Sequence, residues 1–180
     1  MQKKIIGLTG PIASGKGTVK KYIEEKYGGK DCKFSTVLRD VLNRIDEPIS
    51  RESMQKMSFL LRENFGQNIL AKAIAKDIKA LDNNIIVIDG VRRLTDIDYL
   101  KDTHGFTLVK IDANPKIRYE RMVIRNENKG DDKKTFEQFL NDHEADADRE
   151  VPIVMSHASK ALDNNGDLQN LYRQIDELLK

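Results

Sequence analysis

Nine residues near the N-terminus, Gly10–Thr18, have the composition of a phosphate-binding loop. Gly10 and Gly15 are separated by four residues and Lys16 follows directly, as in the pattern G-x-x-x-x-G-K. Glycines let a loop wrap closely around phosphates so that backbone N–H groups point inward. The lysine ammonium can reach the terminal phosphates of a nucleotide. The candidate nucleotide-binding residues are therefore Gly10, Ala13, Ser14, Gly15, Lys16, Gly17 and Thr18.

The sequence on either side supports this interpretation. Lys4–Leu8 is a short apolar run, typical of a strand buried on both faces of a parallel sheet, and Lys16–Tyr27 is predicted to be a helix that ends at Gly28. A plain glycine-rich turn would not need the lysine. Gly17 stands where the usual pattern has Ser or Thr, so Thr18 supplies the first hydroxyl. We therefore expect Mg²⁺ to be held mainly by phosphate oxygens and water, with Thr18 nearby.

Asp89 is a candidate for the Mg²⁺ site because it ends the apolar run Ile85–Ile88. In parallel α/β sheets, ligands gather at the carboxyl ends of the strands. If this strand neighbours Lys4–Leu8, the carboxylate would hold Mg²⁺ through water beside the phosphate loop. The simpler alternative is an aspartate that opens a turn before Gly90.

Three arginines, Arg118, Arg121 and Arg125, have the spacing i, i+3, i+7 of one helix face. They precede the polar segment 126–134, which we interpret as a mobile loop. A lid that presents arginines to the transferring phosphoryl group would stabilise its charge and exclude water. We assign Arg118 to nucleotide binding, and Arg121 and Arg125 to catalysis. The alternative is a solvated charged face that also includes Glu120 and Glu127.

Two further segments carry cations suited to a second phosphate. Arginine grips phosphate oxygens with a planar, two-pronged guanidinium, which makes Arg39, Arg92 and Arg93 candidates for the acceptor site. Arg39 could equally be an ordinary exposed helix arginine. Arg92 could instead pair with a surface carboxylate.

The loop GPIASGKGT, Gly10–Thr18, resembles the phosphate loop of the adenylate kinase and nucleoside monophosphate kinase family, which typically reads GKGT. The segment Ser35–Arg39 resembles the acceptor-side segment of that family, and Asp89–Arg93 resembles its DG-x-x-R segment. The resemblance implies that Ser35, Thr36, Arg39 and Arg93 bind the acceptor phosphate, with Arg92 as an extra cation.

The C-terminal half is similar to dephospho-CoA kinases and to poorly characterised, chiefly archaeal, adenylate-kinase-like proteins. This resemblance rests on the arginines from Arg118 to Arg125 and on Ala158–Leu171. Dephospho-CoA kinases usually carry an aspartate just after the second strand, thought to act as the base. The corresponding residues here are Phe34, Ser35 and Thr36, which include no carboxylate.

The remaining pattern alternates strands with helices, which predicts a parallel sheet between helices. We expect a three-layer α/β P-loop NTPase fold with a parallel five-stranded sheet, formed by residues 1–180 as one domain. Acceptor-binding helices would occupy about 35–82 and a lid about 118–149.

The expected strands are Lys4–Leu8, Cys32–Phe34, Ile85–Ile88, Leu108–Ile111 and Ala161–Leu162. The expected helices are Lys16–Tyr27, two or three within Val37–Leu81, Thr95–Lys101 capped by Thr95, Pro115–Arg125, one from Thr135, and Asp167–Leu179 with Leu168, Leu171, Ile175 and Leu178 on one face.

Composition limits the possible partners and compartment. Lys plus Arg number 31 and Asp plus Glu 29, a net charge of +2, which argues against a nucleic-acid partner. The single cysteine, Cys32, excludes an intrachain disulfide and favours a reducing compartment, which predicts a cytoplasmic protein. No apolar run approaches the length of a membrane span or a signal-peptide core. We expect a monomer or weak oligomer that acts on a small molecule.

These observations predict an enzyme that uses ATP and Mg²⁺ to phosphorylate a nucleotide-like acceptor. A phosphate acceptor is already ionised and needs no base, which favours a nucleoside or deoxynucleoside monophosphate. Dephospho-CoA, a hydroxyl acceptor, is the alternative within the same fold. A nucleotide-binding switch or RNA-associated ATPase is the alternative from another class. GTP remains open as the donor, because such loops bind phosphates and not bases.

Overall fold

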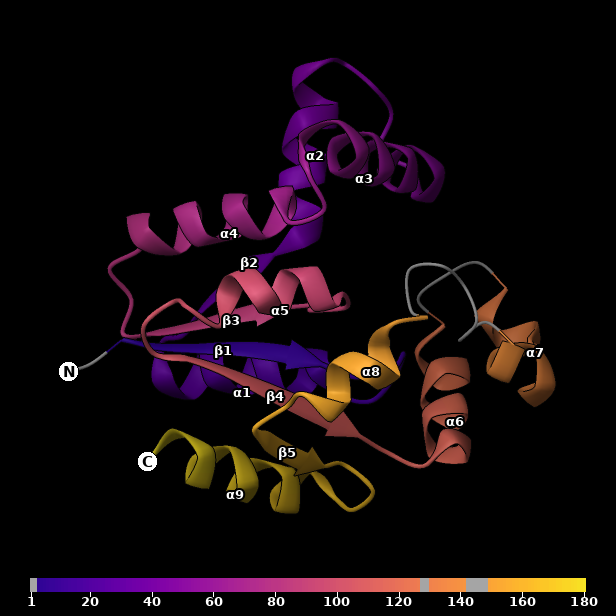
Figure 1. The fold of residues 1–180 in the computed structure, drawn as a ribbon. Coiled ribbons are helices and arrows are strands. Elements are labelled where there is room, and N and C mark those ends of the chain that lie inside the picture. The colour runs from indigo at the N-terminus through magenta and orange to yellow at the C-terminus, as the bar shows by residue number, and fades with distance from the viewer. Residues whose placement is uncertain (1–2, 127–129, 142–148) are drawn as a thin grey trace.

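A computed structural model describes residues 3–126, 130–141 and 149–180 of the chain. Its five strands form one sheet in the order β2-β3-β1-β4-β5, and every neighbouring pair is parallel (Figure 1). The strands are β1 (Lys4–Thr9), β2 (Lys30–Lys33), β3 (Ile85–Asp89), β4 (Phe106–Asp112) and β5 (Lys160–Asp163). The helices are α1 (Lys16–Tyr27), α2 (Phe34–Arg44), α3 (Arg51–Phe65), α4 (Ile69–Ala80), α5 (Leu94–Leu100), α6 (Pro115–Arg125), α7 (Phe136–Asn141), α8 (Val151–Ser156) and α9 (Leu168–Leu179), with a 3-10 turn η1 (Asp131–Lys133).

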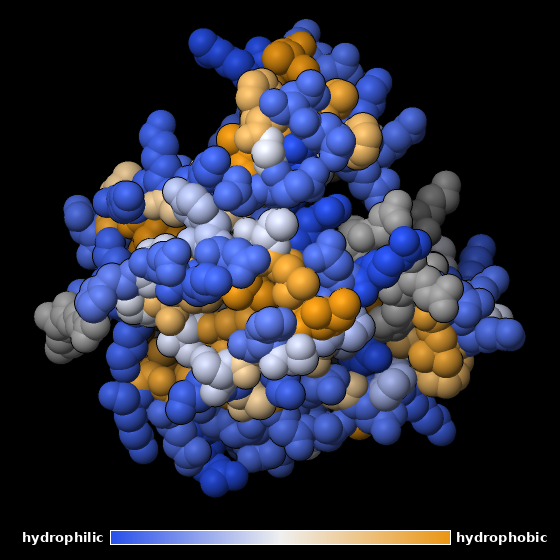
Figure 2. Space-filling view, in the orientation of Figure 1, coloured by the Kyte–Doolittle hydropathy of each residue, from blue (hydrophilic) through white to orange (hydrophobic). Residues whose placement is uncertain are grey.

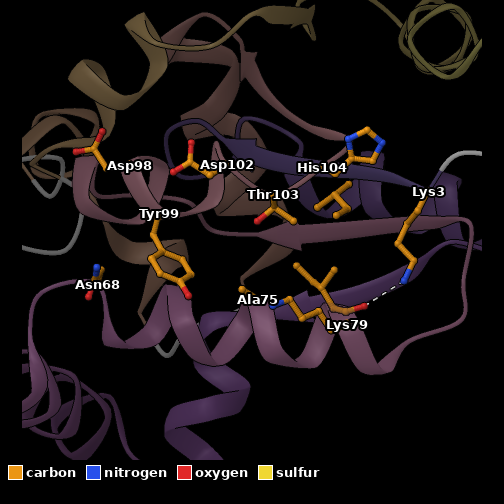
Figure 3. A pocket seen from close by; sticks show the side chains of 11 residues that line it. Lys3, Asn68, Ala75, Lys79, Asp98, Tyr99, Asp102, Thr103 and His104 are labelled. Carbon is orange, nitrogen blue, oxygen red and sulfur yellow. Dashed lines mark hydrogen bonds between the residues drawn. The ribbon is translucent and has the colours of Figure 1, made fainter.

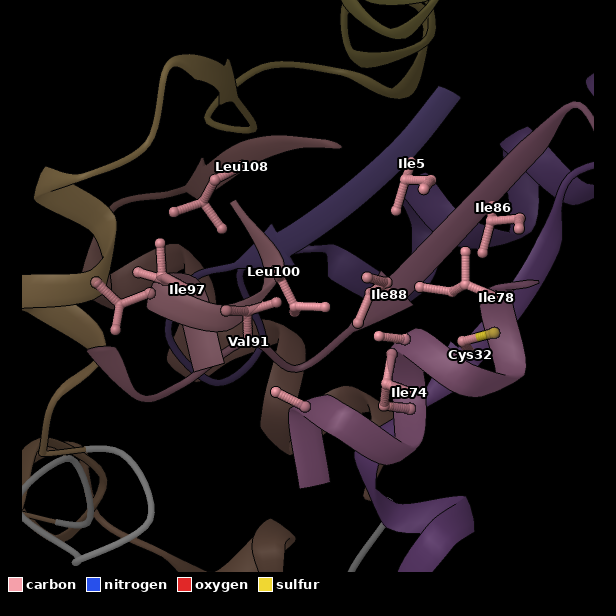
Figure 4. Packing of buried hydrophobic residues seen from close by; sticks show 13 residues of the cluster. Ile5, Cys32, Ile74, Ile78, Ile86, Ile88, Val91, Ile97, Leu100 and Leu108 are labelled. Atoms are coloured by element: carbon pink, nitrogen blue, oxygen red, sulfur yellow. The ribbon is translucent and has the colours of Figure 1, made fainter. Parts of the chain in front are cut away.

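Helices cover both faces of the sheet because successive strand residues point to opposite sides. Ile5, Ile86 and Ile88 pack against α4, α5 and α8 in one buried cluster (Figure 4). Ile6 and Val87, one residue along, pack against α1 and α9 in a second cluster. These two buried layers confirm the predicted three-layer α/β fold.

The central strand β1 brings the candidate site together. Leu8 pairs with Asp89 of β3 on one side and with Val109 of β4 on the other. The carboxyl ends of β1 and β3 therefore lie side by side, so that Asp89 stands beside the start of the phosphate loop. The interpretation of Asp89 as part of a Mg²⁺ site required its strand to neighbour Lys4–Leu8, and β3 does neighbour β1.

The structure corrects two predicted boundaries. Phe34 begins α2 and does not belong to the second strand, which starts earlier, at Lys30. Thr95 lies inside the first turn of α5 and does not cap it. The backbone N–H of Leu94 instead donates to the carboxylate of Glu150 at 3.1 Å, so a side chain distant in sequence caps this helix.

The region between Val37 and Leu81 forms the predicted helices, and α2 and α3 project above the sheet (Figure 1). Three large apolar side chains of α3 are exposed: Phe59, Leu60 and Phe65. Figure 2 shows apolar side chains on the surface of this projecting part. Arg62 is the buried residue of α3.

At the C-terminus, the buried face of α9 differs from the predicted one. Leu171, Ile175 and Leu179 are buried at spacing i, i+4, i+8, whereas Leu168 is half exposed as the first residue of the helix. Asp167 precedes α9 and accepts a hydrogen bond from the Asn170 N–H at 2.8 Å. Helix α8 was not predicted from the sequence.

The structure describes only part of the segment 126–134, which was interpreted as a mobile loop. Gly130–Lys134 contains η1, whereas residues 127–129 and 142–148 lie outside the described residues. The predicted lid, 118–149, therefore includes two stretches about which the structure says nothing. No helix among the described residues combines the length and apolar character that crossing a bilayer requires.

Cys32 is buried in the α4–α5–α8 layer, at 8% exposure, as expected for a small core residue. Burial raises the pKa of its thiol to about 11. At pH 8 only about 10⁻³ of such a thiol is ionised, and the thiolate is the reactive form. We expect iodoacetamide to modify Cys32 slowly in the native protein and rapidly in denaturant, as followed by mass spectrometry. Equal rates in both conditions would contradict this burial.

Candidate active site

The phosphate loop joins β1 to α1 at the carboxyl edge of the sheet, and its geometry requires glycine at positions 10 and 15. Gly10 and Gly15 have φ angles of +147° and +110°. A Cβ at Gly10 would lie 2.2 Å from the Ile111 carbonyl oxygen, and one at Gly15 would lie 2.1 Å from the Asn164 side-chain nitrogen. Any larger residue at either position would displace the loop or its support.

Asn164 supports the loop from the other end of the chain. Its side-chain nitrogen donates to the Ser14 carbonyl at 2.8 Å, and its backbone N–H donates to the Asp112 carbonyl at 2.9 Å. Asn164 is buried, although it follows β5 in a polar turn. By holding the Ser14 carbonyl, Asn164 helps to fix the path of the loop into α1.

The first turn of α1 offers backbone donors to a ligand. Its first i to i−4 bond runs from Val19 N–H to the Gly15 carbonyl. The N–H groups of Lys16, Gly17 and Thr18 precede that bond, as at any helix N-terminus. A Cβ at Gly17 would meet nothing within 4 Å, so space is open at this position. Donors and open space at a helix N-terminus suit an anion.

Lys16 lies folded over the loop. Its ammonium donates to the Gly10 carbonyl at 2.6 Å and to the Pro11 carbonyl at 2.9 Å. Both contacts are with neutral carbonyl oxygens of the loop itself. A phosphate group in the loop would offer the ammonium charged acceptors instead.

Asp89 belongs to a group of charges beside α1. Its carboxylate lies 3.8 Å from the Lys20 ammonium, which is 3.1 Å from Asp31. No cluster of three or more His, Cys, Asp or Glu side chains suited to a metal occurs in the described part of the chain. One carboxylate fits a Mg²⁺ ion that is bound mainly by phosphate oxygens and water.

The three arginines of α6 have different environments, so they do not form one exposed face. Arg118 is buried and donates to the Ala113 carbonyl at 3.0 Å and to the Ile12 carbonyl at 3.3 Å, and its guanidinium lies over the Phe139 ring. Burial lowers the pKa of Arg118. Arg118 therefore braces the phosphate loop. Arg125 is exposed at the end of the helix.

Arg121 is half-buried, between the buried Arg118 and the exposed Arg125, and one of its hydrogen-bond donors is unpaired. Its NH1 nitrogen is buried and has no hydrogen-bond partner among residues 3–126, 130–141 and 149–180. A buried, unpaired guanidinium nitrogen is costly, and such groups call for an explanation. A phosphate oxygen would satisfy it.

A polar cavity of about 460 Å³ lies next to the loop. It is lined by Asp112, Ala113, Asn114, Pro115, Arg118 and Asn165. Arg118 connects the cavity to the phosphate loop through Ile12. The Asn114 N–H donates to the Asn165 side-chain oxygen at 2.7 Å, which links the start of α6 to the turn before α9.

The candidate acceptor residues follow β2 and β3 at the same sheet edge, and they lie on two different parts of the chain. Ser35, Thr36 and Arg39 lie on α2, where Arg39 is exposed. Arg93 precedes α5, and its guanidinium lies 3.9 Å from the Glu150 carboxylate. Arg92 is exposed in the turn after Gly90.

A larger cavity, about 660 Å³, lies elsewhere (Figure 3). Ile78 of α4 and Tyr99 of α5 line it, together with Lys3 and His104, which precede β1 and β4. It therefore reaches the amino ends of these strands, opposite the phosphate loop. In parallel α/β sheets, ligands bind at the carboxyl ends, so we place the candidate active site at the loop.

A protein-family model described as an AAA domain matches residues 6–154 of the chain. The matched range includes the phosphate loop, Asp89 and the arginines of α6. The chain belongs to the AAA domain family. This AAA domain is also 30% identical over 177 residues to a UPF0200 protein of Sulfurisphaera tokodaii, covering 98% of this chain and 96% of that relative.

Solved structures share the fold of this AAA domain at low sequence identity. Shikimate kinase from Bacteroides thetaiotaomicron aligns with a TM-score of 0.62 and 14% identity, over 97% of this chain and 96% of that one. A gluconokinase from Sinorhizobium meliloti aligns with a TM-score of 0.54 and 14% identity, over 96% and 89%. The shared fold is the P-loop arrangement of a parallel five-stranded sheet between helices.

Proposed function

We propose that this AAA domain is a kinase that transfers the terminal phosphoryl group of ATP to a small, nucleotide-like acceptor. The observation that carries the proposal is the loop between β1 and α1, where glycines at 10 and 15 are sterically required and Lys16 lies above backbone carbonyls. The fold shared with proteins named shikimate kinase and gluconokinase supports this reaction class.

Each residue of the site has a task in this proposal. The N–H groups at the start of α1 and the Lys16 ammonium bind the phosphates, and Arg118 keeps the loop in place. A bound Mg²⁺ would neutralise phosphate charge, with Asp89 and Thr18 near it. Arg121 and Arg125 would stabilise the charge that develops on the transferring group. Positioning and charge neutralisation account for most catalysis of this type.

The polar cavity between Asp112 and Asn165 is proposed as the place of the nucleoside. Residues of about 35–82, with Ser35, Thr36, Arg39, Arg92 and Arg93 at the sheet edge, would bind the acceptor. Residues of about 118–149 would form the lid. In Figure 1, α3 of the first region and α6 and α7 of the second lie toward the carboxyl ends of β1 and β3, whereas α4 packs on a face of the sheet.

A nucleoside or deoxynucleoside monophosphate is the proposed acceptor. A phosphate acceptor needs no general base, and the carboxylate nearest the end of β2, Asp31, is already paired with Lys20 and Lys33 at 3.1 Å each. The arginines at 39 and 93 suit an acceptor that carries a phosphate.

A coupled assay of ADP release tests this function. The panel contains ribo- and deoxynucleoside monophosphates, with dephospho-CoA and single-stranded RNA in separate arms. We expect ADP release with at least one monophosphate and formation of the corresponding diphosphate. Conversion of dephospho-CoA alone, or RNA-stimulated ATP hydrolysis without a phosphorylated product, would contradict a monophosphate acceptor.

Arg121→Met should lower kcat by about 10²-fold, because it removes a donor proposed to act on the transferring phosphoryl group. The KM for ATP should change much less. Steady-state kinetics with varied ATP separate the two effects. Arg173→Met is the matched control, since Arg173 is an exposed arginine of α9 that lies 4.0 Å from Glu177. Equal losses in the two variants would remove the catalytic assignment of Arg121.

A further inference from the structure

Four charged side chains, Lys20, Asp31, Lys33 and Asp89, gather beside α1. The Lys20 ammonium lies 3.1 Å from the Asp31 carboxylate and 3.8 Å from that of Asp89. Lys33 lies 3.1 Å from the same Asp31 oxygen that Lys20 approaches. Asp31 therefore holds two ammonium groups, and Lys20 is shared between two carboxylates.

The strand register explains why these groups meet. Lys33 pairs with Asp89, and Asp31 with Val87, so Asp31, Lys33 and Asp89 lie on one face of neighbouring strands. Val87 packs in the α1–α9 layer, which identifies this face as the one that α1 covers. Lys20 reaches the group from α1, one turn after Lys16. The cluster is thus built from α1, β2 and β3, and α1 begins at the phosphate loop.

The burial of the cluster makes its charge balance matter. The side chains of Lys20, Asp31 and Asp89 are only 17%, 19% and 23% exposed. One oxygen of Asp31, Oδ1, is buried without a hydrogen-bond partner in the described part of the chain. Charges in such surroundings interact more strongly than at a free surface. Lys20 has little freedom to turn to water, whereas Lys33, at 40% exposure, has more.

We propose that Asp31 is a positioning residue that draws the Lys20 ammonium toward itself and so prevents a closer pairing of Lys20 with Asp89, which leaves Asp89 available to a Mg²⁺-bound nucleotide. Without the Asp31 charge, the Lys20 ammonium would have Asp89 as its nearest carboxylate and would pair with it directly. Lys20 would then compete with Mg²⁺ for the same oxygens. This inference rests on the proposed function, because it gives Asp89 a task at the nucleotide phosphates.

Calorimetric titration of the full chain with ADP, in excess Mg²⁺ and in EDTA, tests the proposal without any assay of turnover. We expect Asp31→Asn to weaken binding of ADP with Mg²⁺ by about tenfold and to leave binding of ADP in EDTA within twofold. Adding Lys20→Met to Asp31→Asn should restore the Mg²⁺-dependent affinity, because the competing ammonium is gone.

Asp176→Asn is the matched control. Asp176 also accepts an α1 lysine, Lys26 at 2.8 Å, but on the side of α1 that faces α9. It should change neither titration. If Asp31→Asn weakens ADP equally with and without Mg²⁺, or if Lys20→Met brings no recovery, Asp31 is merely structural and the inference fails. If the wild-type chain binds no ADP in either buffer, the proposed function itself fails.

Discussion

Lys16→Ala should reduce kcat for phosphoryl transfer by about 10³-fold, because it removes the only side-chain cation of the loop Gly10–Thr18. The Lys16 ammonium donates to the Gly10 and Pro11 carbonyls of the loop, and the side chain is partly exposed. Its removal should therefore leave the fold intact. Initial rates with saturating ATP and acceptor give kcat, and thermal unfolding monitors the fold.

Lys21→Ala provides the control for this prediction. Lys21 is also on α1, but its side chain is 73% exposed and lies 3.6 Å from Glu25 on the same helix. We expect its rate to match the wild type. Turnover of Lys16→Ala within tenfold of the wild type would contradict the role of the lysine at the phosphates.

Arg62→Met should destabilise the protein by about 3–5 kcal/mol, because it leaves a buried carboxylate without its partner. Arg62 and Asp96 are 6% and 2% exposed, and Arg62 NH2 donates to Asp96 at 3.1 Å. Arg62 also donates to the Gln67 carbonyl. The pair joins the projecting helix α3 to α5. Urea unfolding followed by circular dichroism measures the free energy of unfolding.

The loss of stability in Arg62→Met should increase as pH rises. Burial raises the pKa of Asp96, while Arg62 opposes that rise. Without Arg62 the folded-state pKa climbs further above the unfolded value, so folding favours the protonated acid. The stability of Arg62→Met is then retained at pH values below the pKa of Asp96 in the unfolded chain, and it is lost as pH rises through the pKa of Asp96 in the folded chain. The penalty of Arg62→Met should be larger at pH 7.5 than at pH 4.5.

A second variant keeps this prediction testable if Arg62→Met folds poorly. Arg62→Met combined with Asp96→Leu removes both charges and should recover most of the lost stability, since apolar replacements of a buried ion pair are tolerated. A double variant that is no more stable than Arg62→Met alone would show that the pair is not the source of the loss.

The parts of the fold that could be predicted are those determined by residues close together in the sequence. An apolar strand, a glycine-rich turn and a lysine follow one another within Lys4–Lys16, and each acts through its immediate neighbours. Pro115 likewise starts α6 because a first helical position does not require its N–H. The phosphate loop, the order of the strands and most of the helices were accessible from the sequence for this reason.

The missed features have partners far away along the chain. Asn164 supports Ser14 across 150 positions, Glu150 caps α5 across 56, and Arg62 meets Asp96 across 34. Nothing local distinguishes these polar residues from those of a solvated surface. The Asp31–Lys20–Asp89 group also depends on strand register, which only the folded sheet supplies. A buried asparagine after the last strand becomes recognisable as a loop support only once β5 lies beside β4.

The central claim is that the backbone N–H groups and Lys16 of the loop between β1 and α1 bind the phosphates of a nucleotide. A crystal structure of the chain grown with ADP and Mg²⁺ tests it most directly. We expect the β-phosphate within hydrogen-bond distance of the N–H groups of α1's first turn, with the Lys16 ammonium moved from the Gly10 and Pro11 carbonyls to phosphate oxygen. ADP bound elsewhere, with Lys16 still on those carbonyls, would contradict the account.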